Sequence, residues 1–380
     1  MVTLVLVDAS GEVLGQLPPF EVATPWWQEV GEIAARAGVQ VLRLLHGDRP
    51  HPPGGHVTYL AQTSGRIPDG VVAPAPADLA PHPHRAAYAE VGGPAATLSW
   101  AAGHVDYATA HQQRTWNLSA IWRLDDRNDE PVGWIKQVPA FFEHEPDAIR
   151  AVDAVVPGLV PPLLAAGADG RMLLAHRPGE DGYGAGADVC ARIGAAFHPV
   201  QEHFAGRPIA GIPDRRGIDV GFARAFEEQI PGLGKLLDDL PRRLAEVAAC
   251  GLPDTLVHGD LHPGNVRIGP GGRLTIMDWG DCYRGHPALD ILRLIGHLVD
   301  EEGDEEGDTE AVLGPWAYRW ELSVPGSEPR RAAELMRPIA ALWAAETYAR
   351  FLAAIEPAEH PYHAADVPER LAAAVKAAQI

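Results

Sequence analysis

The sequence has little cysteine and no long apolar run, and each absence restricts the class of protein. Its three cysteines, Cys190, Cys250 and Cys282, are far apart and form no C-x-x-C pair. We therefore expect neither a disulfide framework nor a thiolate metal site. The sequence has no stretch of about 18 uninterrupted apolar residues, so we expect no membrane-spanning helix. The start, MVTLVLVDASGEVLG, lacks a basic leader and reaches Asp8 and Glu12 too early for a secretory signal. These features predict a cytoplasmic protein.

The chain also has fewer basic than acidic residues. The chain has 31 Lys and Arg against 51 Asp and Glu, which gives a formal net charge of −20. Such a charge repels nucleic-acid phosphates and anionic lipid head groups, so we expect no nucleic-acid partner and no membrane partner. It would attract a cationic substrate, although it is equally explained by solubility. The length of 380 residues predicts more than one domain, because single cores stop growing near roughly 250 to 300 residues.

Hydrophobic periodicity divides the chain into three expected domains. Residues 1–105 follow the order strand, strand, helix, strand, strand, with the helix in TPWWQEVGEIAARAG, and predict a small α+β domain. Residues 106–180 predict a β-rich unit, with strands in TWNLSAIWRLDD and PVGWIKQVP. Residues 181–380 are mainly helical in pattern, interrupted by a hairpin of NVRI and RLTIMDW. The acidic run DEEGDEEGDTE at residues 300–310 predicts a solvated loop.

One segment has a spacing specific enough to predict chemistry. LVHGDLHPGNVRIGPGGRLTIMDWGD places Asp260 and Asn265 five positions apart, with Asp278 after a short hairpin. This is the order of a kinase catalytic loop and the metal-binding segment that follows it. Each residue alone could be an ordinary turn residue or helix cap. Their joint order and spacing favour a catalytic site.

The chemistry of phosphoryl transfer explains why these residue types occur together. Negative charge spreads over the transferred oxygens, and positioned divalent ions neutralise it. Asn265 and Asp278 offer the oxygen ligands that Mg²⁺ prefers. Asp260 would accept or orient the proton of an acceptor hydroxyl, and His258 would brace the loop that carries Asp260. We therefore expect ATP and Mg²⁺ as cofactors. Asp290, in GHPALDILRLIG, is expected to cap or anchor a helix.

HGDLHPGN together with IMDWGD resembles the aminoglycoside phosphotransferase and choline kinase family of kinase-like small-molecule enzymes, over roughly residues 106–380. The resemblance implies an α+β, two-lobed protein-kinase-like fold, with a β-rich N-lobe at 106–180 and a mainly helical C-lobe at 181–380. Residues 1–105 are not part of that family's minimal domain, and their role is not predicted. The resemblance implies an ATP-dependent phosphotransferase that moves the γ-phosphoryl group to a hydroxyl of a small molecule.

The resemblance also implies a lysine upstream that holds the phosphates of the nucleotide. Lys136, in GWIKQVP, is the lysine of the strand-rich region. Glu145, just before the helical pattern PDAIRAVDAV, would pair with it and fix its reach. Glu143 is the alternative partner.

Two further segments would contact the nucleotide by their backbone. Amides at Asn117, Leu118 and Ser119 would lie over the phosphates, although this loop departs from the glycine-rich pattern of protein kinases. The resemblance implies that the backbone at Ala175 and His176 meets the adenine edge.

The acceptor is the least specified part of the prediction. The negative charge and the acidic run favour a cationic amino sugar or aminoglycoside. A metabolic sugar or amine kinase is the alternative within the enzyme class, and a non-catalytic nucleotide-binding regulatory protein is the alternative outside it. The presence of Lys136, Asp260, Asn265 and Asp278 argues against a protein that has lost turnover. The sequence predicts no oligomeric state.

Overall fold

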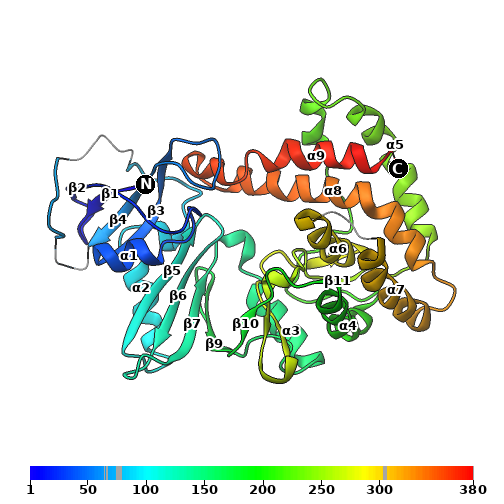
Figure 1. Cartoon of the computed structure of the whole chain (residues 1–380), viewed down its shortest axis with the longest axis horizontal. Helices are drawn as coiled ribbons and strands as arrows, with labels where there is room; N and C mark the ends of the chain where they lie inside the picture. The colour runs from blue at the N-terminus through cyan, green and yellow to red at the C-terminus, as the bar shows by residue number, and fades with distance from the viewer. Residues whose placement is uncertain (64, 66, 74–78, 303–305, 380) are drawn as a thin grey trace. The chain divides into compact units, whose positions relative to one another are not determined.

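The computed structural model describes residues 1–63, 65, 67–73, 79–302 and 306–379, which form two compact units (Figure 1). The first unit comprises Met1–Glu143, Leu163–His176 and Arg350–Ala365, and the second comprises His144–Pro162, Arg177–Ala349 and Asp366–Ile380. Sheets dominate the N-terminal part and helices the C-terminal part, which confirms the predicted α+β class. The expected domain boundaries near residues 105 and 180 stay a prediction.

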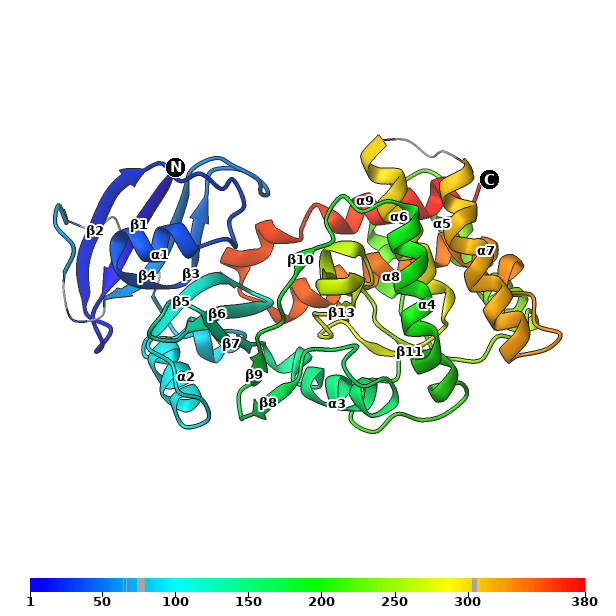
Figure 2. The same ribbon diagram turned by 60° about the horizontal axis from the view of Figure 1, so that its bottom comes forward.

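A four-stranded sheet forms the N-terminal part of the first unit. Its strands β1 (Val2–Val7), β2 (Val13–Phe20), β3 (Val39–Gly47) and β4 (Val57–Thr63) lie in the order β2-β1-β4-β3. β1 and β4 are parallel, and the other neighbours are antiparallel. Helix α1 (Gly31–Ala37) lies across one face of this sheet (Figure 2). Ile33 of α1 joins Leu4 and Val41 of the strands in a buried core.

Helix α1 is shorter than its sequence pattern predicts, because Trp27 is used in the core instead. The Trp27 indole Nε1 donates to the Gly54 carbonyl at 2.7 Å, and the Trp27 carbonyl accepts from the Tyr59 hydroxyl. Its side chain is 2% exposed. Tertiary contacts therefore override the helical pattern before Gly31.

A five-stranded antiparallel sheet forms the rest of the β structure of the first unit. Its strands β5 (Thr109–Trp116), β6 (Ser119–Asp125), β7 (Pro131–Gln137), β8 (Leu163–Ala166) and β9 (Arg171–Ala175) lie in the order β5-β6-β7-β9-β8. One face packs on helix α2 (Gly93–Ala102) through a core that contains Ala101, Trp122 and Leu173.

The edge strand β5 is covered by backbone groups of residues 28–41. Val30 N–H donates to the Gln113 carbonyl at 3.1 Å, and Thr115 N–H donates to the Gln28 carbonyl at 3.0 Å. The Gln112 side chain bonds both backbone groups of Val41, at 2.8 and 2.7 Å. These bonds satisfy an edge that would otherwise present unpaired backbone groups.

Segment 350–365 completes the first unit from the other end of the chain. It contains the 3₁₀ helix η6 (Pro357–Tyr362), which packs on β3. The Tyr362 ring lies edge-on to the Trp27 ring, with centroids 5.8 Å apart, and belongs to the core of the four-stranded sheet. Arg85 forms a two-point ion pair with Glu356, at 2.9 and 2.8 Å.

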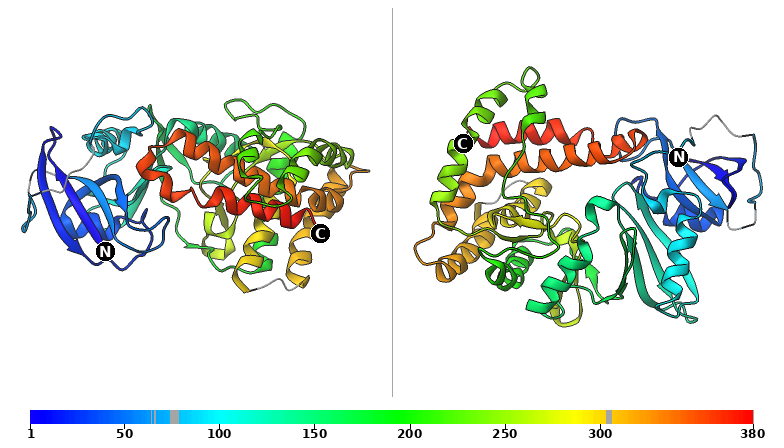
Figure 3. Two further views of the ribbon diagram at one scale, coloured as in Figure 1. Left: turned by 90° about the horizontal axis from the view of Figure 1, so that it is seen from above. Right: turned by 180° about the vertical axis from the view of Figure 1, so that it is seen from behind.

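The second unit is mainly helical. Its helices are α3 (Glu145–Val155), α4 (Ala187–Phe204), α5 (Leu233–Ala249), α6 (Ala288–Glu302), α7 (Glu306–Ser323), α8 (Pro329–Ala354, whose last turn belongs to the first unit) and α9 (Asp366–Ala377). α4 packs against α6 and α7, and α9 ends beside α5 (Figures 1 and 3). Among the residues described, no helix has both the length and the apolarity needed to cross a bilayer.

Short strands position the loops between these helices. The predicted hairpin is confirmed as β12 (Val266–Ile268) and β13 (Leu274–Ile276), and β10 (Glu180–Asp181) extends it. β11 (Thr255–Val257) pairs with β14 (Tyr283–Gly285).

The expectation of a loop at residues 300–310 is wrong in the part that is described. α6 continues to Glu302 and α7 starts at Glu306, while residues 303–305 lie outside the described residues.

The buried carboxyl group of Glu359 makes the stability of the first unit depend on pH. Burial, and next the charge of Glu356, raise its pKa to about 8, although Arg43 opposes this shift. The ordinary pKa of this group, which applies to the unfolded chain, is 4.5. Between this pH and about 8, Glu359 is therefore protonated in the folded chain and ionised in the unfolded chain. Stability from this group is present below the unfolded pKa and is lost as the pH rises to about 8.

We expect Glu359→Gln, which keeps the shape of the side chain but cannot ionise, to flatten the fall in Tm between about pH 5 and pH 8.5 by roughly a few degrees. Thermal unfolding across this range measures the effect. Glu369→Gln, on the exposed side of α9, is the matched control. A variant that loses stability with pH as steeply as the wild type would contradict the assignment.

Candidate active site

Two loops of the second unit bring the predicted catalytic residues together. One follows β11 and carries His258 and Asp260, and the other follows β13 and carries Asp278. Gly259 has a φ of +86°, and a Cβ at this position would lie 2.2 Å from the Asp281 carbonyl oxygen. Only glycine permits so close an approach of the two loops.

His258 joins the two loops. Its side chain is fully buried, its Nε2 lies 2.9 Å from the Met277 carbonyl, and its Nδ1 accepts from Asp260 N–H at 3.3 Å. This pattern assigns the proton to Nε2. Burial lowers the pKa of His258 to about 4, so the ring is neutral near pH 7. Through these bonds His258 links Asp260 to Met277, the residue before Asp278.

The Asp260 carboxylate is held at both oxygens. Oδ2 accepts from Asn265 Nδ2 at 3.1 Å, and Oδ1 accepts from Arg293 Nε at 2.9 Å. His262 Nε2 lies 3.4 Å from Oδ2. The Asp260 side chain is 38% exposed. Its partial desolvation would raise the pKa, but the hydrogen bond with His262 and the charge of Arg293 hold the pKa below its ordinary value. Asp260 is therefore an anion near pH 7.

Asp278 lies in the left-handed region of the backbone, with a φ of +60°. Residues other than glycine seldom adopt this region, although aspartate and asparagine do so more readily than most. The Met277 N–H donates to the Asn265 carbonyl at 2.8 Å, which ties the loop of Asp278 to that of Asn265.

Asn265 and Asp278 suit a magnesium ion that is completed by other ligands. Asn265 Nδ2 is used on Asp260, so its Oδ1 is the atom left to a cation. In the described part of the chain, no group of three or more His, Cys, Asp or Glu side chains could hold a metal by itself. Mg²⁺ is commonly bound by one or two protein oxygens, with phosphates and waters completing its octahedron. The donor set therefore fits magnesium together with a nucleotide.

Glu145 also contacts the loop of Asp278. It lies in the first turn of α3, is 1% exposed, and its Oε1 accepts from Trp279 N–H at 3.1 Å. Glu143 is exposed. Burial thus distinguishes the two candidate partners of Lys136, while the pairing of Lys136 with Glu145 stays a prediction. Lys136 itself is buried on β7, in register with Ile121 of β6 and Met172 of β9.

The tip of the β5–β6 hairpin is fixed by segment 350–365. The Asn117 side chain is buried, its Nδ2 donates to the Glu359 carbonyl at 3.4 Å, and its Oδ1 lies 3.0 Å from His363 Nε2. The Ser119 hydroxyl accepts from Trp116 Nε1 at 3.2 Å, and Leu118 is half-buried. The side chains of Asn117 and Ser119 are thus used within the protein. Contact of the hairpin amides with phosphates stays a prediction.

The residues predicted to meet adenine lie at the end of β9. Ala175 is paired with Gly133 of β7. His176 accepts a hydrogen bond at Nδ1 from Trp134 Nε1 at 3.1 Å, so its ring is engaged by the sheet. A backbone contact of Ala175 and His176 with the nucleotide stays a prediction.

Two residues of α6 contact the catalytic loop. Asp290, expected to cap or anchor a helix, lies in the first turn of α6 and ties this helix to the catalytic loop. It accepts from the N–H groups of His258 at 3.0 Å and Gly259 at 3.1 Å, and from Gln201 Nε2 at 3.0 Å. Burial raises the pKa of Asp290 to about 7. Arg293 was not among the residues predicted from the sequence. The available signal was a cation one helical turn after Asp290, because residues three apart share a helix face.

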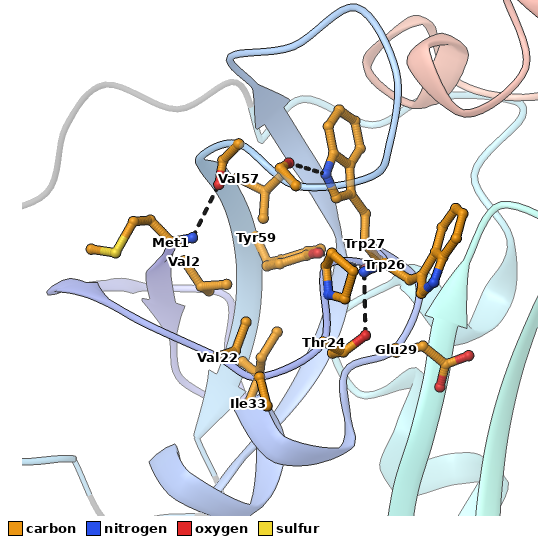
Figure 4. Close-up of a pocket in the computed structure, with 14 residues that line it drawn as sticks. Met1, Val2, Val22, Thr24, Trp26, Trp27, Glu29, Ile33, Val57 and Tyr59 are labelled. Atoms are coloured by element: carbon orange, nitrogen blue, oxygen red, sulfur yellow. Dashed lines mark hydrogen bonds between the residues drawn. The ribbon is translucent and has the colours of Figure 1, made fainter.

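Two pockets of the first unit are separate from these residues. One, of about 200 Å³, is surrounded by Trp26, Trp27, Tyr59 and Ile33 (Figure 4). It is smaller than the roughly 300 Å³ at which ligand pockets begin. The other, of about 450 Å³, lies between α1 and the strands β5 and β6. Neither is lined by a predicted catalytic, metal or nucleotide residue.

The braced Asp260 of one loop, Asp278 of the next and the hairpin between them form the pattern of a kinase-like phosphotransferase. Residues 130–321 match the phosphotransferase enzyme family, also denoted APH. The match spans just over half of the chain and includes both loops and α6, so the chain belongs to this family of small-molecule kinases. None of the curated proteins compared with the sequence matches it.

Several solved structures are similar to this chain, and the first of them supports the fold. A choline/ethanolamine kinase family protein from Mesorhizobium loti has 16% identity and a TM-score of 0.54, with 76% of this chain and 95% of that chain covered. An aminoglycoside phosphotransferase from Streptomyces rimosus, solved with ADP and streptomycin, has 18% identity, a TM-score of 0.44 and coverages of 63% and 95%. A spectinomycin phosphotransferase, solved with ADP and spectinomycin, has 13% identity, a TM-score of 0.49 and coverages of 73% and 95%.

Proposed function

We propose that the protein transfers the γ-phosphoryl group of ATP to a hydroxyl group of a small molecule. The observation that carries this proposal is the Asp260 carboxylate, which Asn265 and Arg293 orient by hydrogen bonds. It lies on a loop that His258 ties to the residue before Asp278. An oriented carboxylate next to a magnesium ligand is what transfer to a hydroxyl requires.

The reaction assigns a task to each group. The acceptor oxygen attacks the γ-phosphorus, the bond from that phosphorus to the ADP oxygen breaks, and ADP leaves with the bonding electrons. Asp260 accepts the hydrogen bond of the acceptor hydroxyl and takes up its proton. Lys136 binds the phosphates of the nucleotide. Mg²⁺, held by Asn265 and Asp278, would neutralise charge on the phosphate oxygens.

The acceptor we favour is a cationic amino sugar or aminoglycoside. The net charge of −20 supports it, because such a field attracts cations over long distances. A neutral sugar or a choline-like amine, as in a metabolic kinase, is the alternative. Arg293 offsets the charge of Asp260 at the reacting carboxylate itself, so the attraction arises from the surface as a whole.

A coupled assay of ADP release tests the proposal. The protein is supplied with Mg-ATP and a panel of aminoglycosides, amino sugars, neutral sugars and choline-like amines, and each active compound is repeated with Asp260→Asn. Release with one class of compound, lost in the variant, supports the function and identifies the acceptor class. Silence across the panel, with Mg-ATP binding intact by calorimetry, would favour an acceptor outside the panel or the non-catalytic regulatory alternative.

A further inference from the structure

One face of α6 contacts the catalytic loop at successive points. Asp290, Arg293 and His297 are three and four residues apart, which places them on one side of the helix. Asp290 accepts from the loop amides of His258 and Gly259. Arg293 donates to Asp260 Oδ1. The His297 ring is stacked near that of His262, with centroids 6.3 Å apart.

The contact of Arg293 with Asp260 differs from the other contacts of this carboxylate. Asn265, which holds Oδ2, is also a proposed magnesium ligand, whereas Arg293 has no proposed role toward metal or nucleotide. A carboxylate has about four lone-pair sites, so these hydrogen bonds leave capacity for an acceptor hydroxyl.

The exposure of the ion pair between Arg293 and Asp260 indicates whether it contributes to stability or to the orientation of the carboxylate. The side chains of Arg293 and Asp260 are 40% and 38% exposed. Ion pairs this exposed contribute little to stability. Orientation matters much more, because a displacement of about 1 Å can lower turnover by roughly 100-fold.

We infer that Arg293 is a positioning residue for phosphotransfer, which holds Oδ1 of Asp260 so that the carboxylate keeps one orientation toward the acceptor hydroxyl. This inference rests on the proposed function. Arg293 acts through Asp260, and its removal leaves nucleotide binding in place.

Arg293→Met is expected to lower kcat by roughly 10- to 100-fold, while the KM for Mg-ATP changes less than about twofold. Arg293→Lys should recover part of kcat, since lysine supplies the charge without the planar fork. Arg330→Met is the matched control, because Arg330 forms a similarly exposed pair with Glu310 at 2.7 Å, away from the loop. The control should keep wild-type kcat and show a Tm similar to that of Arg293→Met.

A double-mutant cycle distinguishes a positioning role from a general one. If Arg293 acts through Asp260, Arg293→Met should reduce kcat little further in the Asp260→Asn background. An equal loss in both backgrounds, or a wild-type kcat in Arg293→Met, would overturn the inference while the proposed function stands. Absence of turnover in the wild-type protein would overturn the proposed function and this inference with it.

Discussion

Asp260→Asn is expected to lower turnover by roughly 10²- to 10⁴-fold, the usual contribution of a positioned acid or base. The amide keeps the size of the carboxylate but cannot take up the proton of the acceptor hydroxyl. Mg-ATP affinity should stay nearly unchanged, because Asp260 is not a proposed ligand of metal or nucleotide. The coupled assay measures kcat, and calorimetry measures the affinity.

Asp147→Asn is the control for this substitution. Asp147 is an exposed residue of α3, paired with Arg150 at 2.8 Å, so its variant should keep wild-type turnover. Unaltered turnover in Asp260→Asn would remove this carboxylate from the mechanism.

Asp278 is expected to affect nucleotide binding rather than proton transfer. Its removal should weaken Mg-dependent binding of ATP by at least about tenfold, since a carboxylate ligand is lost from the magnesium ion. Asp278→Ala also places alanine at a φ of +60°, which adds strain. Asp278→Asn is the better variant, because asparagine tolerates the left-handed region.

Titration of ATP binding against magnesium measures this second effect. The wild type and Asp278→Asn should differ in the presence of magnesium and agree in its absence. A magnesium dependence that is the same in both proteins would contradict the assignment of Asp278 as a ligand.

Local sequence patterns correctly predicted those features of the structure that are determined by residues close together in the sequence. The hairpin between the two loops and the class of the fold follow from periodicity and turn residues. The sequence revealed four candidate residues because all of them lie in one short segment: His258, Asp260, Asn265 and Asp278. The structure brings the first three into direct contact. Their chemical roles stay predictions.

The sequence could not reveal contacts that bring distant segments together. Arg293 meets Asp260 across 33 residues of sequence, and its place one helical turn after Asp290 shows which face of α6 it shares but not which loop that face contacts. Asn117 was considered for its backbone amide, while its side chain bonds His363 across 246 residues. The start of α1 was misjudged for the same reason, because Trp27 is held by Gly54 and Tyr59.

The position of Tyr362 in the core of the first unit has a consequence for synthesis of the chain. The four-stranded sheet is complete by residue 63, yet its core includes a side chain near the C-terminal end. During translation, the four-stranded sheet therefore emerges long before Tyr362, which contributes to its core, is available. A chain stopped before residue 350 should expose Trp27 and bind chaperones or aggregate, so the four-stranded sheet depends for its stability on a segment that is synthesised much later.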